Sequence, residues 1–319
     1  MRLQILYHGN CFDGVVSAAI FARFFREKIE PKAEIIYRPM AHGRGDPYGP
    51  DHDAIFNADQ NAVVDFRYST SPRLTWWCDH HQSAFLQPED KKHFDADQTS
   101  QKCFDPTAPS CSGLLLKWLV SSHGFDGSPL ADQAYWADLI DSARFESPRQ
   151  AVELAEPALQ LMALLESAPV PLANAMAEGL SKENVGKVHS WLEVQKALGP
   201  VLAAHRRNID IVRSRMDVEN GVAYFDLTAD EVRSLNKFIP YYLNKEVKYT
   251  VGVTRTRDRN KISVGSNPWQ RPEPLINLAE LCQLYGGGGH PVVAGASFPI
   301  EELAEAQQAA REIANKLRG

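Results

Sequence analysis

The sequence has little surplus positive charge, few cysteines and no long apolar run. Acidic residues outnumber lysine and arginine by 40 to 34, and the net charge of -6 argues against indiscriminate nucleic-acid binding through a large basic surface. A small phosphorylated substrate held in a local basic pocket is compatible with this balance. The five cysteines are scattered and form no CxxC pair, which predicts reduced thiols rather than a disulfide framework.

No apolar run is long enough to span a bilayer, so no membrane partner is expected. The first residues, "MRLQILYHGN", pass directly into a strand pattern, without the apolar core and cleavage site of a signal peptide. Together with the reduced cysteines, these absences predict a cytoplasmic protein. The sequence leaves the oligomeric state open, with a homodimer as one option.

The residues that are present predict an α/β fold with two domains. Strand patterns of the first part lie at 3–8, 33–39, 61–69 and 73–81. Apolar residues at helical spacing follow the first of them at 15–28, and this alternation is typical of a mostly parallel sheet flanked by helices. The predicted segments are an N-terminal domain over 1–190, a helical connector over 191–220 and a smaller C-terminal α/β domain over 221–319.

Acidic and imidazole side chains follow the ends of predicted strands and helices. They are His8 and Asp13 in "YHGNCFDG", Asp65 in "VVDFRYS", Asp79, His80 and His81 in "CDHH", and Asp138 and Asp141 in "ADLIDSARF". Because the carboxyl ends of parallel strands share one edge of a sheet, these groups can meet there. Carboxylates and imidazoles suit Mn²⁺, Mg²⁺ or Fe²⁺, and a bridging carboxylate such as Asp65 would hold two cations about 3.5–4 Å apart.

Each of these residues also has a structural alternative. Asp13 precedes Gly14 and taken alone is more simply a helix N-cap. Asp65 could form a buried salt bridge with an arginine, although an unpaired carboxylate in an apolar strand would be costly. Adjacent histidines could lie on the surface by chance. The occurrence of all four segments at strand or helix ends favours a metal centre over this set of separate explanations.

The "CDHH" motif is similar to the signature of the DHH phosphoesterase superfamily. The other segments follow in that family's order, and "DSARF" resembles its last acidic motif, which favours Asp141 over Asp138. "YGGGGHPVVAGASF" resembles the Gly-Gly-Gly-His motif of the DHH-associated C-terminal domain. "YHGNCFDGVVSA" looks closest to the branch described as oligoribonucleases or cyclic-nucleotide phosphodiesterases.

The resemblance implies a DHH catalytic domain over 1–190, a DHH-associated substrate-binding domain over 221–319, and two divalent metals. Mn²⁺ is the first expectation, with Mg²⁺, Fe²⁺ or Co²⁺ as alternatives. The implied metal ligands are His8, Asp13, Asp65, His80 and Asp141, with Asp65 bridging. Asp79 would orient an imidazole, and His81 would donate to a phosphate oxygen. Gly287, Gly288, Gly289 and His290 would bind the rest of the substrate.

The sequence departs from the family pattern at two places. Cys11 stands where many members have an aspartate, and it is either a thiolate ligand or a small buried residue. Gly265 stands where relatives often have an arginine for substrate phosphate, and Arg271 or Asn267 could substitute for it. The glycines of "GGGGH" are either a helix stop or an anion-binding concavity, and their number favours the second. Trp269 could stack a base, although loop packing is the simpler interpretation.

The function predicted from these observations is metal-dependent hydrolysis of short oligonucleotides or related nucleotide phosphodiesters to mononucleotides, by two-metal activation of water. The expected partner is thus a short oligonucleotide or a small phosphorylated substrate, and not a long duplex. A second hypothesis keeps the metals and makes inorganic polyphosphate or pyrophosphate the substrate. A third is a nucleotide-binding regulatory protein that is catalytically weak because an aspartate is missing.

Overall fold

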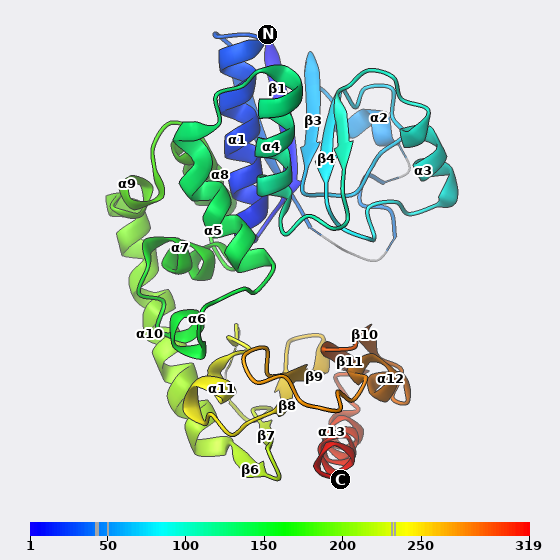
Figure 1. Cartoon of the computed structure of the whole chain (residues 1–319), viewed down its shortest axis with the longest axis vertical. Coiled ribbons are helices and arrows are strands. Elements are labelled where there is room, and N and C mark those ends of the chain that lie inside the picture. Colours follow the sequence, from blue (N-terminus) through cyan, green and yellow to red (C-terminus); the bar gives the residue numbers. More distant parts are fainter. Residues whose placement is uncertain (42–44, 50, 231, 233) are drawn as a thin grey trace. The chain divides into compact units, whose positions relative to one another are not determined.

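The computed structural model describes residues 1–41, 45–49, 51–230, 232 and 234–319 (Figure 1). The chain divides into two compact units. The first comprises Met1–Phe145 with Ala155–Pro200, and the second Glu146–Leu154 with Val201–Gly319. Both units are α/β, which confirms the predicted fold class, whereas the predicted domain bounds at 190 and 220 stay a prediction. Among the described residues, no helix is both long and apolar enough to cross a membrane.

The first unit is built on a parallel sheet with helices on its faces. Its strands are β1 (Arg2–His8), β2 (Glu34–Met40), β3 (Gln60–Val64), β4 (Trp76–Asp79) and β5 (Lys102–Phe104). Its helices are α1 (Phe12–Lys28), α2 (His52–Ile55), α3 (Pro88–Asp95), α4 (Cys111–His123), η1 (Ser128–Leu130), α5 (Ala131–Asp141), α7 (Pro157–Leu165), α8 (Val170–Leu180) and α9 (Val185–His189). The helix α10 (Leu192–Arg215) continues into the second unit past Pro200.

The strand order of this sheet is β2-β1-β3-β4-β5, and all neighbours pair in parallel. The chain therefore passes from β1 outward to β2 and then returns to β3 on the other side of β1. Such a reversal opens a crevice outside the carboxyl ends of the two central strands, where open α/β sheets bind ligands. Here those ends are His8 of β1 and Val64 of β3.

The two tryptophans of β4 pack on opposite faces of the sheet, because successive strand residues point to opposite sides. Trp76 contacts the rings of Phe21 and Phe24 on α1, at centroid distances of 5.6 Å. Trp77 packs among aromatic rings on the other face, including that of Phe104, and its indole N–H donates to the Phe66 carbonyl at 2.9 Å. Both are buried core residues, which agrees with the interpretation of the pair as packing.

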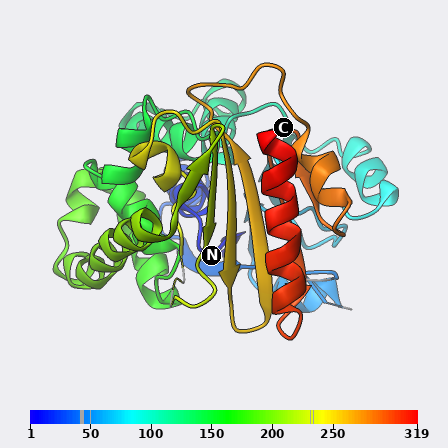
Figure 2. The same ribbon diagram turned by 90° about the horizontal axis from the view of Figure 1, so that it is seen from below.

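The second unit is built on a mixed sheet (Figure 2). Its strands are β6 (Asp217–Glu219), β7 (Val222–Asp226), β8 (Tyr249–Arg255), β9 (Arg259–Ser266), β10 (Gly288–His290) and β11 (Val293–Pro299), in the order β10-β11-β9-β8-β7-β6. Its helices are α6 (Pro148–Glu153), α11 (Ile239–Leu243), α12 (Leu278–Gln283) and α13 (Leu303–Arg318), with the rest of α10.

One face of the second sheet is covered by α12 and α13. The apolar side of α13, including Ala310 and Ile313, packs with Val251, Ile262 and other alternate strand residues in one core. This is the amphipathic helix that the apolar spacing of the last residues predicts. Because side chains alternate, the residues between these core positions project from the other face of the sheet.

Candidate metal centre

The ends of β1, β3 and β4 bring the predicted histidines and acids together. His8 is the last residue of β1, and Asp65 directly follows β3. Asp65 has a left-handed backbone, with φ of 55°, which turns the chain away from the strand direction. Such a conformation costs a non-glycine residue about 1–2 kcal/mol and is often retained at functional sites. β4 ends at Asp79, so strand alternation no longer separates His80 from His81, and their ring centroids lie 4.6 Å apart.

The Asp65 carboxylate lies at the centre of this group and is almost fully buried. One oxygen, Oδ2, lies 3.4 Å from His8 Nδ1. The other, Oδ1, lies 3.7 Å from His80 Nε2 and 3.6 Å from His81 Nδ1. Within the described residues, neither oxygen accepts a hydrogen bond. Burial, reinforced by the negative charge of Asp13, raises the Asp65 pKa well above its usual range. The ionised form of a buried carboxylate without hydrogen-bond donors is costly unless a nearby cation compensates its charge.

His80 is oriented by the backbone for binding a cation. Its Nδ1 lies 3.0 Å from the Ala108 carbonyl, so this nitrogen carries the proton and donates. Its Nε2 lone pair then faces the carboxylates, at 3.7 Å from Asp13 Oδ2 and 3.4 Å from Asp141 Oδ2. Among the residues described, Nε2 has no hydrogen-bond partner. Metal-binding histidines are commonly fixed in this way, with one nitrogen on a carbonyl and the other on the metal.

Asp13 caps a helix, but not its own. Its two carboxylate oxygens accept the backbone N–H groups of Cys111 and Ser112, at 2.7 and 2.8 Å. These groups belong to the first turn of α4, whose positive dipole end therefore faces the carboxylate. The N-cap of α1 itself is Cys11, which makes no side-chain capping bond. The N-cap alternative for Asp13 is therefore wrong: Asp13 lies inside the first turn of α1, and its carboxylate binds the first turn of α4 while facing the metal centre.

Two groups of possible metal ligands share the Asp65 carboxylate. One contains His8 and His81 and the other Asp13 and His80, each with Asp65, and the ligand atoms within a group lie within 4.8 Å of one another. The donors are nitrogen and oxygen, and the buried Asp65 oxygens and His80 Nε2 have no other partner among the described residues. These features fit divalent cations such as Mn²⁺ or Mg²⁺ on both sides of one carboxylate.

The two acids of α5 have different surroundings. Asp141 is the last residue of the helix and points at His80, as its 3.4 Å distance shows. Asp138, one turn earlier, accepts a hydrogen bond of 2.5 Å from Ser110 Oγ. Ser110 is also the N-cap of α4, so Asp138 supports the helix end that holds Asp13. The structure therefore places Asp141 beside the predicted metal ligands and gives Asp138 a supporting contact.

Asp79 holds both histidines of the motif through one oxygen. Its Oδ1 accepts the backbone N–H of His80 at 2.8 Å, that of His81 at 3.2 Å and the His81 Nδ1–H at 2.7 Å. Burial lowers the pKa of His81, but the hydrogen bond and charge of Asp79 outweigh it, and the His81 pKa is raised. A protonated His81 can donate a hydrogen bond at a site whose carboxylates only accept.

Cys11 lies beside the metal centre but in neither ligand group of the described residues. Burial, together with the negative charge of Asp13, raises the pKa of the half-buried thiol to about 12. Without a cation the side chain is therefore a neutral thiol at physiological pH. Its part as a metal ligand stays a prediction.

The four glycines of the second unit have different surroundings. Gly286 has φ of 71° and follows α12, as a helix stop requires. A Cβ on Gly287 would lie 2.2 Å from the Gly295 carbonyl oxygen, and one on Gly289 would lie 2.6 Å from the backbone of β11. A Cβ on Gly288 would meet nothing within 4 Å. Backbone conformation thus accounts for Gly286 and packing for Gly287 and Gly289, and Gly288 and the exposed His290 are left open to a ligand.

The remaining predicted substrate residues lie in the loop after β9. Asn267 is buried, and its amide donates to the Val247 carbonyl at 2.7 Å while its oxygen accepts the Trp269 backbone N–H at 2.9 Å. The structure therefore gives this side chain a use within its own loop. Trp269 packs edge-on against Phe238, at 5.3 Å between centroids, which agrees with loop packing. Arg271 is exposed.

Sequence reasoning did not identify two backbone features that organise this centre. The Ala108 carbonyl selects the tautomer of His80, and the first turn of α4 binds Asp13. The binding of Asp13 by α4 has a local signal, since the serines of "APSCSG" indicate a helix start there with Ser110 or Ser112 as the N-cap, and the structure shows Ser110. The contact with Ala108 has none, because any residue type offers a carbonyl.

The fold and this geometry define a two-domain α/β protein with a candidate dinuclear metal centre at the switch point of a parallel sheet. Residues 219–316 match the DHHA1 domain family. No curated protein matches the chain in sequence.

Solved structures share the fold of the whole chain. The pGpG-specific phosphodiesterase PggH from Vibrio cholerae superposes with a TM-score of 0.68 at 16% identity, covering 100% of this chain and 99% of that one. An exopolyphosphatase-related protein from Bacteroides fragilis gives 0.56 at 17% identity, with 100% and 94% covered. RecJ from Thermus thermophilus, in complex with Mn²⁺, gives 0.50 at 13% identity, with 99% of this chain but only 52% of RecJ covered. Residues 219–316 therefore match the DHH-associated domain that the glycine motif predicts, and the whole chain shares its fold with these structures.

Proposed function

We propose that the chain is a divalent-metal-dependent phosphodiesterase that hydrolyses short oligonucleotides or related nucleotide phosphodiesters to mononucleotides. The observation that carries this proposal is the Asp65 carboxylate, buried between His8 and the His80–Asp13 pair. Two cations bound there would neutralise substrate phosphate and activate water. The likeness in fold to a pGpG-specific phosphodiesterase supports a nucleotide phosphodiester as the substrate.

The proposed metal ligands are His8, Asp13, Asp65, His80 and Asp141, with Cys11 as a further possible donor. His81 is kept outside this set because its Nδ1 donates to Asp79 at 2.7 Å. In its protonated form His81 donates a hydrogen bond to a phosphoryl oxygen and stabilises negative charge that develops there. Asp79 is a positioning residue, because it acts on the substrate only through His81.

The test is hydrolysis of a 5′-labelled dinucleotide by the purified protein with Mn²⁺, beside His80→Ala and a polyphosphate control. We expect turnover of the dinucleotide and a loss of at least about a hundredfold in the variant, since a metal ligand is removed. The likeness to an exopolyphosphatase-related protein makes polyphosphate the second candidate substrate. If the protein released phosphate from polyphosphate and did not hydrolyse the dinucleotide, polyphosphate would replace the nucleotide as the proposed substrate. Nucleotide binding without turnover under any divalent metal would favour a regulatory protein.

Gly288→Ala is expected to weaken substrate binding without affecting the fold. The added methyl group meets no protein atom within 4 Å, so the melting temperature should stay close to that of the wild type. If substrate phosphate approaches the backbone at this point, the methyl group intervenes, and KM for the dinucleotide should rise about tenfold, which corresponds to about 1.4 kcal/mol. Steady-state kinetics and thermal unfolding measure the two effects.

Gly287→Ala is the matched contrast. Its methyl group would lie 2.2 Å from the Gly295 carbonyl oxygen, so this variant should lose about 1–3 kcal/mol of stability. A Gly288→Ala enzyme with unchanged KM would show that the glycine segment serves packing only.

A further inference from the structure

The hairpin between β8 and β9 concentrates positive charge in an otherwise acidic chain. Its segment 255–261 contains Arg255, Arg257, Arg259 and Lys261 against a single acid, Asp258. All four cations are exposed, and within the described part of the chain none of them belongs to an ion pair. The whole chain carries a net charge of -6, so this local surplus is opposite in sign to the rest of the molecule.

Hydrogen bonds hold the hairpin in a defined shape. The Thr256 hydroxyl donates to Asp258 Oδ1 at 2.7 Å, and the Thr256 backbone N–H donates to the Arg259 carbonyl at 2.9 Å. Behind the turn, the buried Asn260 amide donates to the Pro299 carbonyl at 2.7 Å and ties β9 to β11. A ligand that binds the cations therefore does not have to order the backbone that carries them.

Two of the cations share a sheet face with His290. On β9, Ile262 belongs to the core under α12 and α13, so Arg259 and Lys261 project from the opposite face by strand alternation. On β11, Ala294 belongs to the same core, so Val293 also projects from that opposite face. His290 pairs directly with Val293 and therefore lies on it too. We call this surface the polar face of the second sheet.

The polar face offers a continuous path from His290 to the hairpin. Val293 pairs with Gly265, which lies four residues from Lys261 along β9, roughly 13 Å in strand length. Between these two levels the polar face carries only small residues on β9 and β11, namely Ser263 and its partner Gly295, and Ser297 lies beside Lys261. Arg259 continues the same row roughly 7 Å further on.

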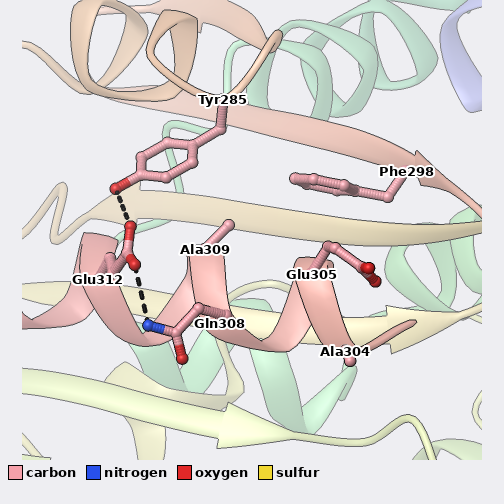
Figure 3. A pocket seen from close by; sticks show the side chains of 7 residues that line it. All are labelled: Tyr285, Phe298, Ala304, Glu305, Gln308, Ala309 and Glu312. Atoms are coloured by element: carbon pink, nitrogen blue, oxygen red, sulfur yellow. Dashed lines mark hydrogen bonds between the residues drawn. The ribbon is translucent and has the colours of Figure 1, made fainter. Parts of the chain in front are cut away.

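The helix-covered face has the opposite character. A groove of about 430 Å³ lies there between α13 and the rings of Tyr285 and Phe298 (Figure 3). Glu305 and Glu312 line it, and Glu312 accepts a hydrogen bond of 3.0 Å from the Tyr285 hydroxyl. Carboxylates repel phosphate, so a polyanion would be directed to the polar face and the hairpin.

We propose that the β8–β9 hairpin binds the distal phosphates of a single-stranded oligonucleotide longer than a dinucleotide, which lies along the polar face from His290. This inference rests on the proposed function and names its substrate class more closely. Arginine predominates among the cations, and its planar fork matches phosphate oxygens. The segment 255–261 contains no apolar side chain that could insert into a membrane, which favours nucleic acid over an anionic lipid surface.

The test compares Arg259→Gln with Lys261→Gln as a double variant against Arg206→Gln with Arg207→Gln, two exposed arginines of α10. Both double variants remove two charges and keep polar side chains of similar length. Affinity for a labelled RNA octamer with hydrolysis-resistant phosphorothioate linkages is measured by fluorescence anisotropy with Mn²⁺ over a range of salt concentrations. A labelled dinucleotide and vesicles containing anionic lipid are the other two probes.

Loss of two phosphate contacts should reduce the slope of log affinity against log salt by roughly 1.4 and weaken octamer binding about 25-fold at 0.1 M salt. Dinucleotide affinity should change less than about twofold, and the α10 variant should behave as the wild type. An unchanged octamer slope, an equal loss for the dinucleotide, or binding to vesicles without binding to the octamer would each overturn the proposal. Because binding is measured without turnover, a failure of the proposed hydrolysis would be distinguishable from a failure of this surface.

Discussion

Asp65→Asn should abolish phosphodiesterase turnover while leaving the metal-free protein at least as stable as the wild type. The wild-type carboxylate is buried, and among the described residues neither of its oxygens accepts a hydrogen bond. The amide keeps the shape and removes the buried charge, so its desolvation costs less. Loss of a carboxylate shared by both ligand groups should lower kcat/KM by at least about a thousandfold.

Thermal unfolding with and without Mn²⁺ separates this role from a structural one. Mn²⁺ at about 100 times its Kd should stabilise the wild type by about 2.7 kcal/mol and should not stabilise the variant. The raised Asp65 pKa means that the metal-free native state holds a proton that the unfolded chain releases above about pH 4. Wild-type stability without metal should therefore fall as pH rises from that value toward the raised pKa, and this contribution should vanish in the variant.

Asp138→Asn is the matched control, because Asp138 bonds Ser110 and lies outside the ligand groups of the described residues. It should retain the stabilisation by Mn²⁺ and most of the activity. If Asp65→Asn retained the stabilisation by Mn²⁺ and the activity, Asp65 would not be the carboxylate that holds the metals.

Asp79→Asn should reduce kcat/KM by up to about a hundredfold and move the alkaline limb of its pH profile to lower pH. The asparagine oxygen can still accept the backbone N–H groups of His80 and His81, so the turn is retained. What is lost is the negative charge that, with the hydrogen bond to Nδ1, raises the His81 pKa against the effect of burial. His81 then loses its proton at lower pH and ceases to donate to phosphate.

The pH dependence of kcat/KM for the dinucleotide measures this effect, since a purely structural defect would lower the rate without moving the limb. His81→Gln provides the control, because it cannot titrate. If Asp79 acts through His81, adding Asp79→Asn to His81→Gln should cost much less than Asp79→Asn alone. A full additive loss would show that Asp79 has a role independent of that imidazole.

Much of the candidate site follows from local sequence. The strand before His8 and the strand before Asp65 are apolar runs that must be buried, and parallel strands share one carboxyl edge. The acids and imidazoles therefore converge wherever the strands pair in parallel. The motif order in turn indicated the DHH superfamily, and the DHHA1 match over 219–316 agrees with it.

The number of consecutive glycines was a less reliable indication of an anion-binding site than the surroundings of each glycine. The four consecutive residues were more than a turn needs, which favoured an anion site for the whole segment. The structure gives Gly287 and Gly289 close contacts with β11 and Gly286 a positive φ, and leaves Gly288 with neither constraint. No sequence pattern separates these cases, because each depends on the distance to a strand that follows later in the chain.

Apolar patterning accounts for which side chains gather at the sheet edge, since strand burial and chain direction are its local consequences. How those side chains are held depends on contacts between elements that are far apart in the sequence. Asp13 meets the backbone of Cys111 and Ser112 across nearly a hundred residues, and His80 meets the Ala108 carbonyl. These partners are backbone groups that every residue possesses, so only the packing of α1, α4 and β4 selects them.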